Sequence, residues 1–547
     1  MYKFIAISFS LLVQLLLHGQ NVRESQQLTN TSVSQQIDSL LLAFATVNLF
    51  NGSALVVRHG DTLLSKGFGF ADYNTKKQNT PASLFRIYSV TKPITATIIL
   101  KLIQEKKLSL DDKLSKFYPD FPAADSISVK NLLTHTSGIY SFNNDGSMPF
   151  DSEDNMMSFL KKTPLHFPAG TAWKYSNTGY FLLGFIIQKI TGMKYEAAVD
   201  KYVFKPLKMT ASGFNYDTVS NEHKTTGYTF LYKDSARISG IHDEKELFSS
   251  GAMYTNTADL YKYHMAMQNY ILINKNLTEQ AYMPFKKNYG YGWMTDSLWG
   301  RRLIHHSGGA MGFRSELMRI YSDNICIVLL SNCENSDLEF LKKNILAALY
   351  GKPVKVPFAV SLSTAKLNEL TGAYNFKPGF TIYITRENNR LMAQPSRQNK
   401  QQILPETASR YYVPSIEGYL EFRSSANNVF DSLILLQKGD RFVGRRVEAG
   451  WGITGTIKES GWDGPDIELV KNKEANGLWS VHDILLKKGD LKFRFNNDWT
   501  FCLGDNNGDG IAENSGENIK VEYGRYDIVL DLRDAANARY VIRRREF

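Results

Sequence analysis

The spacing of apolar residues in the first part of the chain predicts strands followed by helices. Apolar residues from Ile37 to Phe44 recur at helical spacing. Residues 53–58 and 62–70 have the pattern of strands, and the His-Gly-Asp turn between them predicts that they pair antiparallel. Longer apolar runs at residues 94–103 and 179–190 then predict two buried helices, the second of which ends at a Thr-Gly pair.

Strand patterns return further along, at residues 289–293, 303–306 and 325–330. Because strands stand at both ends of a helical stretch, we expect an α+β fold whose antiparallel sheet is closed by segments distant in sequence. This domain is assigned to residues 36–350.

The pattern changes at residues 351–357, where a glycine and two prolines predict a domain boundary. Beyond it, helix patterns nearly vanish. Residues 365–446 predict a small β-rich module, with its clearest strands at 380–385, 419–423 and 433–437. Residues 448–547 carry turn signals about every ten positions, which is typical of a β-sandwich. The expected architecture is therefore an α+β domain followed by two all-β modules.

The first twenty residues have the pattern of a secretory signal peptide. A basic start at Met1–Lys3 is followed by an almost wholly apolar run, Phe4–Leu17, and a polar exit. This run is shorter than the ~20 residues of a membrane-spanning helix, so we favour a cleaved signal peptide, residues 1–20, over an uncleaved anchor. Residues 21–35 predict a flexible polar leader. We expect a secreted protein, in the periplasm or at the outer membrane, with no integral membrane segment after cleavage.

The composition of the chain excludes some classes of protein but does not by itself indicate a function. A chain of 547 residues is long enough for two to four domains. Its formal charge of +10 comes from scattered basic residues without an arginine-rich run, so nucleic acid is not an expected partner. The three cysteines, Cys326, Cys333 and Cys502, are too few for a disulfide framework, and we expect buried free thiols.

The candidate nucleophile lies where the first long helix begins, in Ser89-Val90-Thr91-Lys92. Residues three apart share a helix face, so the amine of Lys92 can reach the Ser89 hydroxyl and make its proton easier to remove. Spacing alone does not single out this pair, because two others have it, Ser158 with Lys161 and Ser363 with Lys366. A base and an oxyanion site elsewhere in the chain must decide.

Tyr175-Ser176-Asn177 stands just before the second apolar helix. Beside a lysine-activated serine, Tyr175 can act as a general base if a neighbouring ammonium favours its phenolate. Asn177 can donate its amide to a substrate carbonyl. The segment Tyr254-Thr255-Asn256 has the same spacing, so this signal is also weak by itself.

His306-Ser307-Gly308-Gly309 lies in a predicted strand. Glycines let a substrate lie against a strand edge, and an exposed main-chain N–H there can serve an oxyanion hole. Strand alternation places His305 on the opposite face from His306.

These three segments resemble, in order, the motifs of the serine β-lactamase and penicillin-binding-protein superfamily. The resemblance is to the class C β-lactamase-like branch, which also holds D-aminopeptidases, D,D-carboxypeptidases and esterases. The sequences around and between the motifs also resemble that branch, at residues 132–138, 168–177 and 306–313. The resemblance covers residues from about 35 to 350 and implies a β-lactamase/D,D-peptidase-like catalytic domain.

The resemblance implies a role for each motif residue. Ser89 attacks a carbonyl and becomes acylated, while Lys92 and Tyr175 share the proton transfers. Asn177 positions the substrate or Lys92, and the backbone N–H groups of Ser89 and Gly309 form the oxyanion hole. No cofactor is implied.

His306 departs from the lysine that β-lactamases and most transpeptidases of the superfamily have in the third motif, and resembles the aminopeptidase and esterase members. A histidine loses its charge near neutral pH, which weakens recognition of a substrate carboxylate. This departure disfavours an efficient β-lactamase. Among substrates we expect D-amino-acid peptides or peptidoglycan stem peptides first, of the D,D-carboxypeptidase or D-aminopeptidase type, then small esters, and then β-lactams. A carbohydrate-associated binding protein with a weak hydrolase domain is the alternative from another class.

The last module holds four of the seven tryptophans and resembles the starch-binding β-sandwich domains of the outer-membrane SusE and SusF proteins. Exposed indoles stack on sugar faces, which would give the module a glycan ligand that holds the enzyme near its substrate. Trp462 and Trp479 are surrounded by polar, loop-like sequence and are the candidate sugar contacts. Trp451 and Trp499 are expected in the core.

Asp505-Asn506-Asn507-Gly508-Asp509-Gly510 has the alternating oxygen ligands of a calcium loop, with Asp505, Asn507 and Asp509 as candidates. The closing glutamate is missing, because the twelfth position is Gly516. A hairpin turn rich in asparagine and glycine explains the same letters.

Overall fold

The computed structural model describes residues 31–545 apart from short gaps, and the chain divides into two compact units, one ending at Val356 and the other beginning at Pro357. The predicted signal peptide and residues 21–30 of the predicted leader lie outside the described residues. The gaps are residues 142–151, 232–235, 241–245, 356–361, 378–379, 388–389, 397, 399, 414–415, 417, 425–429, 438, 448–449, 463–465, 473, 476, 497 and 535–537.

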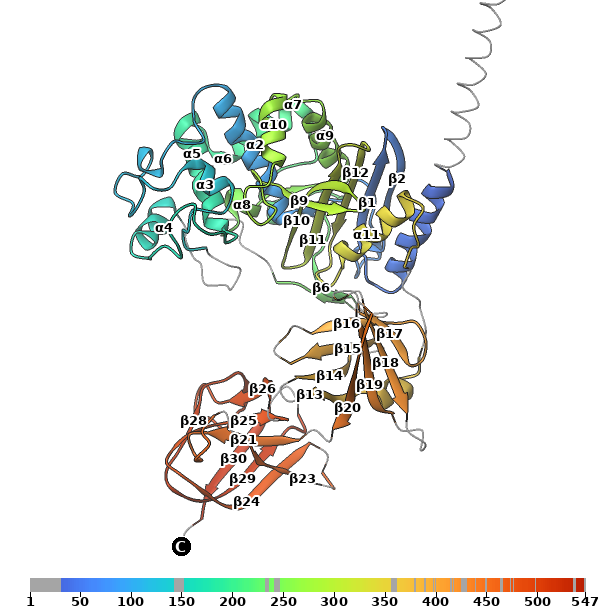
Figure 1. Ribbon diagram of the computed structural model, residues 1–547, viewed down its shortest axis with the longest axis vertical. Helices are drawn as coiled ribbons and strands as arrows, with labels where there is room; N and C mark the ends of the chain where they lie inside the picture. The colour runs from blue at the N-terminus through green and yellow to red at the C-terminus, as the bar shows by residue number, and fades with distance from the viewer. Residues whose placement is uncertain are drawn as a thin grey trace, which may run out of the picture. The chain divides into compact units, whose positions relative to one another are not determined.

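The first unit is built on a six-stranded antiparallel sheet with the strand order β2-β1-β12-β11-β10-β9 (Figure 1). The interior strands β1 and β12 are buried along nearly their whole length, which explains their continuous apolar sequences. They pair with each other, so the sheet is closed by segments from the two ends of the domain, as the sequence pattern predicts. The strands are β1 (Gly52–Arg58), β2 (Asp61–Phe68), β9 (Met294–Leu298), β10 (Arg301–Ala310), β11 (Phe313–Ile320) and β12 (Ile325–Ser331).

Helices cover both faces of this sheet (Figure 1). Alternate residues of β11 show the two faces, because Glu316 contacts Lys342 of α11 whereas Arg319 contacts Gln268 of α9. A helix formed by residues 31–46 packs against α11, where the Phe44 and Phe340 rings are in contact. On the side of α9 lie α2 and α5, the helices at which the first two motifs stand, whereas the third motif belongs to β10. The bounds of these helices are α2 (Thr91–Gln104), α5 (Asn177–Thr191), α9 (Thr257–Gln268) and α11 (Leu338–Leu349).

Short elements complete the first unit and position the site. The helical ones are η1 (Tyr88–Val90), η2 (Leu114–Lys116), α3 (Val129–Leu133), α4 (Glu153–Leu160), α6 (Tyr195–Val199), η3 (Asp200–Phe204), α7 (Lys205–Leu207), η4 (Tyr216–Thr218), α8 (Phe248–Gly251) and α10 (Lys275–Tyr282). The strands are β3 (Phe70–Asp72), β4 (Lys77–Gln78), β5 (Phe85–Arg86), β6 (Tyr228–Leu231), β7 (Ala236–Ile238) and β8 (Tyr254–Thr255).

Two segments of the first unit differ from the sequence prediction. Residues 31–36 are already helical, so the helix is longer than the apolar positions from Ile37 indicate, and the last five residues of the predicted leader belong to it. Residues 289–293 form turns rather than a strand, and β9 begins only at Met294. Gly292 has a φ of +79°, a left-handed conformation that ends strand geometry.

The second unit begins with α12 (Thr364–Leu370) and an eight-stranded barrel. Each strand pairs with the next, and β13 pairs with β20 through Ala373 and Val447, which closes the barrel. Its interior is filled by aromatic and branched side chains such as Tyr374, Leu433 and Ile403. The strands are β13 (Gly372–Lys377), β14 (Phe380–Glu387), β15 (Arg390–Pro395), β16 (Gln401–Pro405), β17 (Arg410–Val413), β18 (Gly418–Ser424), β19 (Phe430–Gln437) and β20 (Asp440–Val447).

Two antiparallel sheets follow the barrel and share one core, to which Phe493 and Ile528 contribute from different sheets. The expected α+β domain followed by all-β modules is therefore confirmed. One sheet holds β21 (Trp451–Gly455), β22 (Ile467–Glu468), β25 (Gly489–Phe495), β26 (Asp498–Gly504), β27 (Glu513–Asn514) and β28 (Ile519–Val521). The other holds β23 (Val470–Lys471), β24 (Leu478–Leu486), β29 (Gly524–Asp531) and β30 (Arg539–Arg544). Among the described residues, no helix is long and apolar enough to cross a membrane.

Candidate active site

Ser89 lies in the turn η1 that leads into α2, where its side chain is partly exposed between buried neighbours. Tyr88, directly before it, has a φ of 44°, which is unfavourable for a bulky residue. The Tyr88 hydroxyl donates to the main-chain oxygen of Met311 at 2.8 Å. The turn between β10 and β11 therefore holds this strained backbone and keeps Ser89 accessible.

The Lys92 side chain is fully buried beside Ser89. Its Nζ lies 3.0 Å from Ser89 Oγ, 2.8 Å from Asn177 Oδ1 and 2.9 Å from the main-chain oxygen of Ser250. Burial lowers the pKa of Lys92 well below its ordinary value of 10.5. The surroundings therefore favour a neutral amine held by three hydrogen-bonding groups.

Tyr175 lies beside Ser89 and Lys92, with its hydroxyl near enough to the Ser89 side chain to affect the Tyr175 pKa. The Tyr175 ring lies 4.8 Å from Lys92 Nζ and packs against the His135 ring at 4.3 Å. Burial raises the pKa of Tyr175 far above 10, so the hydroxyl keeps its proton. The condition under which the sequence allowed a phenolate is not met, because the neighbouring lysine is itself pushed toward its neutral form.

The second motif is positioned by helix capping. Ser176 is the N-cap of α5, and its hydroxyl accepts a hydrogen bond from Gly179 N at 3.1 Å. His135 Nδ1 accepts from Ser176 N at 3.1 Å. Asn177 is consequently the first helical residue, with its side-chain oxygen on Lys92.

His306 is fully buried and has both ring nitrogens occupied. Its Nδ1 lies 2.7 Å from Ser307 O, which can only accept, so Nδ1 carries the proton. Its Nε2 lies 2.9 Å from the Tyr289 hydroxyl and accepts from it. Burial lowers the pKa of His306 to about 3. The third motif therefore presents no positive charge at neutral pH.

The strand that carries His306 changes its pairing at this residue. β9 pairs with β10 only from Arg301 to His305, and beyond His305 no described strand covers the outer edge of β10. A Cβ atom at Gly308 would lie 2.2 Å from Ile87 O and 2.9 Å from Ser89 N. Glycine is therefore required for β10 to pass against the turn that holds Ser89, and an open strand edge begins beside this residue.

The structure brings together all the predicted catalytic residues, Ser89, Lys92, Tyr175, Asn177 and His306, with Ser307, Gly308 and Gly309 along the open edge. It also adds two contacts that sequence reasoning missed, the Tyr289 hydroxyl on His306 and the Ser250 carbonyl on Lys92. Neither position carries a motif, and only the fold makes them neighbours of the site.

The competing segments have structural roles. Ser363 is the N-cap of α12 and accepts from Lys366 N at 3.2 Å, while Lys366 Nζ pairs with Glu369. Ser158 is exposed on α4. Asn256 is the N-cap of α9 and accepts from Asp259 N, so the Tyr254-Thr255-Asn256 segment starts a helix.

The two tryptophans predicted to contact sugar lie in different surroundings. Trp479 packs against the sandwich core and, with Trp451, lines a cavity of about 370 Å³. Trp462 instead lies beside Trp499, with ring centroids 5.8 Å apart, and Arg494 covers the Trp499 ring at 4.8 Å. Trp451 therefore packs against the core as expected, whereas Trp499 is outside the described core cluster.

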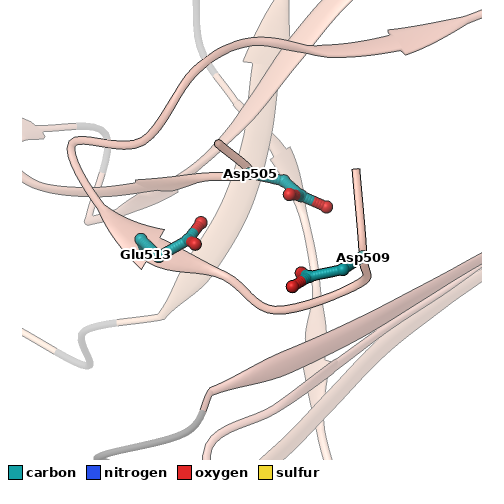
Figure 2. A group of neighbouring side chains, drawn as sticks. All are labelled: Asp505, Asp509 and Glu513. Atoms are coloured by element: carbon teal, nitrogen blue, oxygen red, sulfur yellow. The ribbon is translucent and has the colours of Figure 1, made fainter. Parts of the chain in front are cut away.

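In the candidate calcium loop, Asp505 and Asp509 are neighbours of Glu513 (Figure 2), and each of the three carboxylates has an oxygen within 4.8 Å of the others. The chain's own donors already occupy both oxygens of Asp505. One accepts from Asn507 N and Gly508 N, and the other accepts from Gly510 N and the Tyr540 hydroxyl, at 2.6–3.0 Å. These contacts are those of a tight turn, which explains the sequence without an ion.

Comparison with known proteins agrees with this geometry. A family model described as Beta-lactamase matches residues 45–352. Penicillin-binding protein 4* of Bacillus subtilis (strain 168) is 27% identical over 439 residues, which cover 74% of this chain and 97% of the relative. Because this share exceeds the family match, the similarity extends past the first unit.

Solved structures share the fold. The octameric penicillin-binding protein homologue from Pyrococcus abyssi has a TM-score of 0.55 and 24% identity, covering 75% of this chain and 99% of the other. The D-amino acid amidase from Ochrobactrum anthropi SV3 has a TM-score of 0.51 and 23% identity, covering 58% and 99%. The resemblance of residues 448–547 to SusE and SusF domains stays a prediction.

Proposed function

Because this chain belongs to the β-lactamase family of serine hydrolases, we propose that Ser89 is its nucleophile and that it cleaves D-amino-acid peptides through an acyl-enzyme. The observation that carries the proposal is the buried Lys92 amine 3.0 Å from Ser89 Oγ. A desolvated, neutral lysine is a base strong enough to take a serine proton.

The contacts of Lys92 define the direction of the first proton transfer. A neutral amine has two N–H groups, and the Asn177 and Ser250 oxygens at 2.8 and 2.9 Å accept both. The lone pair is then left for the Ser89 hydroxyl, which donates its proton as Oγ attacks the carbonyl carbon. Asn177 acts in this step by orienting Lys92.

Tyr175 completes the proton path as a phenol. Once Lys92 holds the serine proton, its charge stabilises a transient loss of the Tyr175 proton, which goes to the leaving amine or alkoxide. The proton on Lys92 then restores the phenol. Water repeats these steps in reverse order to release the acid and regenerate Ser89.

The oxyanion of the tetrahedral intermediate is proposed to bind the main-chain N–H groups of Ser89 and Gly309. The close approach of Gly308 to Ser89 N supports this assignment, since it brings the two main-chain segments together. Donors fixed before reaction stabilise developing charge without reorganisation.

The substrate class follows from the third motif. A neutral His306 offers no ammonium for a carboxylate, so a β-lactam or an acidic leaving group gains little there. The open edge of β10 instead offers main-chain groups to an extended peptide. We rank D-amino-acid peptides first, above all those whose leaving group carries no free carboxylate, small esters second and β-lactams third.

The test is the stereochemical preference of hydrolysis. The full chain should cleave D-alanyl amides and esters at least about tenfold faster than the L forms, and Ser89→Ala should abolish both activities. Equal rates for the D and L forms would remove the D-peptide assignment and leave a general esterase. Faster hydrolysis of a penicillin than of either amide would reverse the ranking.

A glycan-binding role of the last module is the second candidate, favoured by the cavity between Trp451 and Trp479. Asn496, Glu468 and Lys471 supply polar groups beside the two indoles, as sugar recognition requires. Trp479→Ala should weaken glucan binding measured by calorimetry, whereas Trp462→Ala, outside the cavity, should not. If neither the wild type nor the variants give a binding heat with any glucan, the proposed glycan-binding role is contradicted, and the proposed hydrolase activity is unaffected.

Export is proposed from the first twenty residues. Mass spectrometry of the protein purified from its own cells should show a mature chain that lacks residues 1–20. A retained Met1 would contradict cleavage.

A further inference from the structure

A buried group of charged side chains lies behind the strand that carries the third motif. It joins His305 of β10 to Glu316 of β11, Asp296 of β9, and Lys342 of α11. His305 is 5% exposed and Glu316 and Lys342 are 2% exposed, so these three charges are removed from water, whereas the Asp296 side chain is 56% exposed and closes the group at the surface. The roles assigned to the three motifs do not involve these four charged side chains.

The contacts are short and continuous. His305 Nδ1 lies 3.0 Å from Glu316 Oε1, and His305 Nε2 lies 2.9 Å from Asp296 Oδ2. Lys342 Nζ lies 2.9 Å from the same Glu316 oxygen and 2.7 Å from Glu339 Oε2. Because both nitrogens of His305 meet carboxylates, the imidazole satisfies both partners only when it is protonated.

The place of His305 along β10 gives the group its significance. His305 is the last residue that pairs with β9, through Met294, and the open edge begins with His306. Strand alternation puts His305 on the face of Glu316, away from Ser89, and His306 on the face of the active site. His305 is therefore the final fixed point of β10 before the edge that passes Ser89.

The charges agree with this geometry. Burial lowers the pKa of His305, but the hydrogen bonds to Asp296 and Glu316 outweigh it and raise the pKa to about 9. Burial raises the pKa of Glu316, yet Lys342 and His305 lower it to about 2. Lys342 and Glu339 from α11 complete the charged groups that face His305 and Glu316.

We propose that His305 is a positioning residue: its imidazolium, clamped between Asp296 and Glu316, fixes the open edge of β10 so that an extended substrate lies in register with Ser89. This inference rests on the proposed function, because it assumes that Ser89 is acylated by substrates lying on that edge. The clamp acts through β10 and touches neither substrate nor Ser89.

The clamp has a pH dependence of known sign. Its folded-state pKa of about 9 lies above the ordinary histidine value of 6.5, so its contribution is complete below about 6.5 and is lost as pH rises through about 9. Above that pH one nitrogen loses its proton and one carboxylate loses its donor. Binding along the edge should then weaken, while attack on a small reagent should not.

The experiment compares two covalent probes on the full chain. A small alkyl fluorophosphonate reacts with Ser89 without using the edge, and a peptidyl fluorophosphonate with D-alanine next to phosphorus uses it. In wild type, the ratio of peptidyl to alkyl labelling rates should be high at pH 7 and should fall about tenfold or more between pH 8 and 10. In His305→Gln the ratio should already be low at pH 7 and should not change with pH.

Controls separate this inference from the proposed function and from general destabilisation. Arg301→Gln removes a charge from the other end of β10, where Arg301 pairs with Asp323, and should keep the wild-type ratio. In Glu316→Gln, the pKa of His305 measured by NMR should fall from about 9 toward 6.5. A wild-type ratio in His305→Gln at every pH, or a His305 pKa that Glu316→Gln leaves unchanged, would overturn the inference. Absence of alkyl labelling in wild type would instead remove the proposed nucleophile.

Discussion

Burial distinguishes Lys92 from the lysines of the other two Ser-x-x-Lys pairs. Lys92 is fully buried with its amine beside Ser89 Oγ, whereas Lys161 is exposed and pairs with Asp120, and Lys366 is partly exposed and pairs with Glu369. A buried amine loses the solvation of its charge and becomes a base, while an exposed one stays a cation. The same four-residue spacing therefore has different chemistry in different surroundings.

Replacing this base should reduce acylation without unfolding the protein. Lys92→Ala should lower the rate of Ser89 acylation by about 10²- to 10⁴-fold, the usual contribution of a general base. Stopped-flow labelling with a chromogenic ester measures the rate. Lys101→Ala, which removes a lysine from the last turn of the same helix, is the control and should react as wild type does. A Lys92→Ala rate within a factor of three of the control would show that another group takes the proton.

His306 should not titrate in the physiological range. Its pKa of about 3 lies below its ordinary 6.5, so the imidazole stays neutral from pH 5 to 8 and contributes no step to activity there. NMR of ¹⁵N-histidine protein should show His306 as the Nδ1-protonated neutral form throughout. A His306 midpoint near 6.5 would contradict the burial and the Tyr289 contact.

The sequence predicts that Ser89, Lys92, Tyr175, Asn177 and His306 belong to one site, and the structure brings them together, but the sequence could not give the protonation state of any of them. The Tyr175 phenolate depended on an ammonium that burial of Lys92 disfavours. Tyr289 was not predicted because it reaches His306 only through the turns at residues 289–293. Burial and long-range contacts decide these points, and neither can be read from spacing.

Close packing of β10 against η1 makes Gly308 the least replaceable residue of the strand. Gly308→Ala would place Cβ 2.2 Å from Ile87 O, so the strand or the nucleophile turn must move. We expect about 1–3 kcal/mol of lost stability and a loss of Ser89 labelling. Gly240→Ala is the control, because its Cβ would meet only Met311 Sδ at 3.5 Å. Wild-type labelling of Gly308→Ala would show that the strand does not pass where the structure places it.

The buried charges behind β10 should dominate the pH dependence of stability on that face. Glu316→Gln leaves Lys342 and His305 without their shared carboxylate and should cost about 3–5 kcal/mol at pH 7, measured by urea unfolding. The Glu316 pKa is lowered from 4.5 to about 2, so its stabilisation is complete above about 4.5 and is lost as pH falls toward 2.

An exposed glutamate is the matched control for that measurement. Glu279→Gln removes an exposed partner of Lys275 and should cost no more than about 0.5 kcal/mol. Equal losses in Glu316→Gln and Glu279→Gln would mean that the buried network does not stabilise the fold.

Errors in the predicted elements have physical causes. The alternating aromatic and glycine residues at 289–293 imitate strand period, but Gly290 and Gly292 are there because a Cβ would collide with Ala281 O and Ala96. The first turns of helix 31–46 are largely exposed and polar, so the apolar pattern starts only at Ile37. The sequence predicts β12 and α5 correctly because elements buried on most sides consist of long, nearly uninterrupted runs of apolar residues.

Across the whole chain, the α+β unit and the two β-rich modules follow from pattern changes alone, and each has its own hydrophobic core. Barrel closure could not be foreseen, because it depends on β13 pairing with β20 some seventy residues later. All the proposed catalytic residues lie within the family match at residues 45–352. The chemistry of the protein is therefore expected from the first unit.

Intact-mass spectrometry after treatment with a fluorophosphonate tests the central claim most directly. The full-length wild type should gain the mass of one phosphonyl adduct, peptide mapping should place it on Ser89, and Ser89→Ala should gain none. An adduct of equal yield on Ser89→Ala, or a wild type that stays unmodified, would contradict the assignment of Ser89 as the nucleophile.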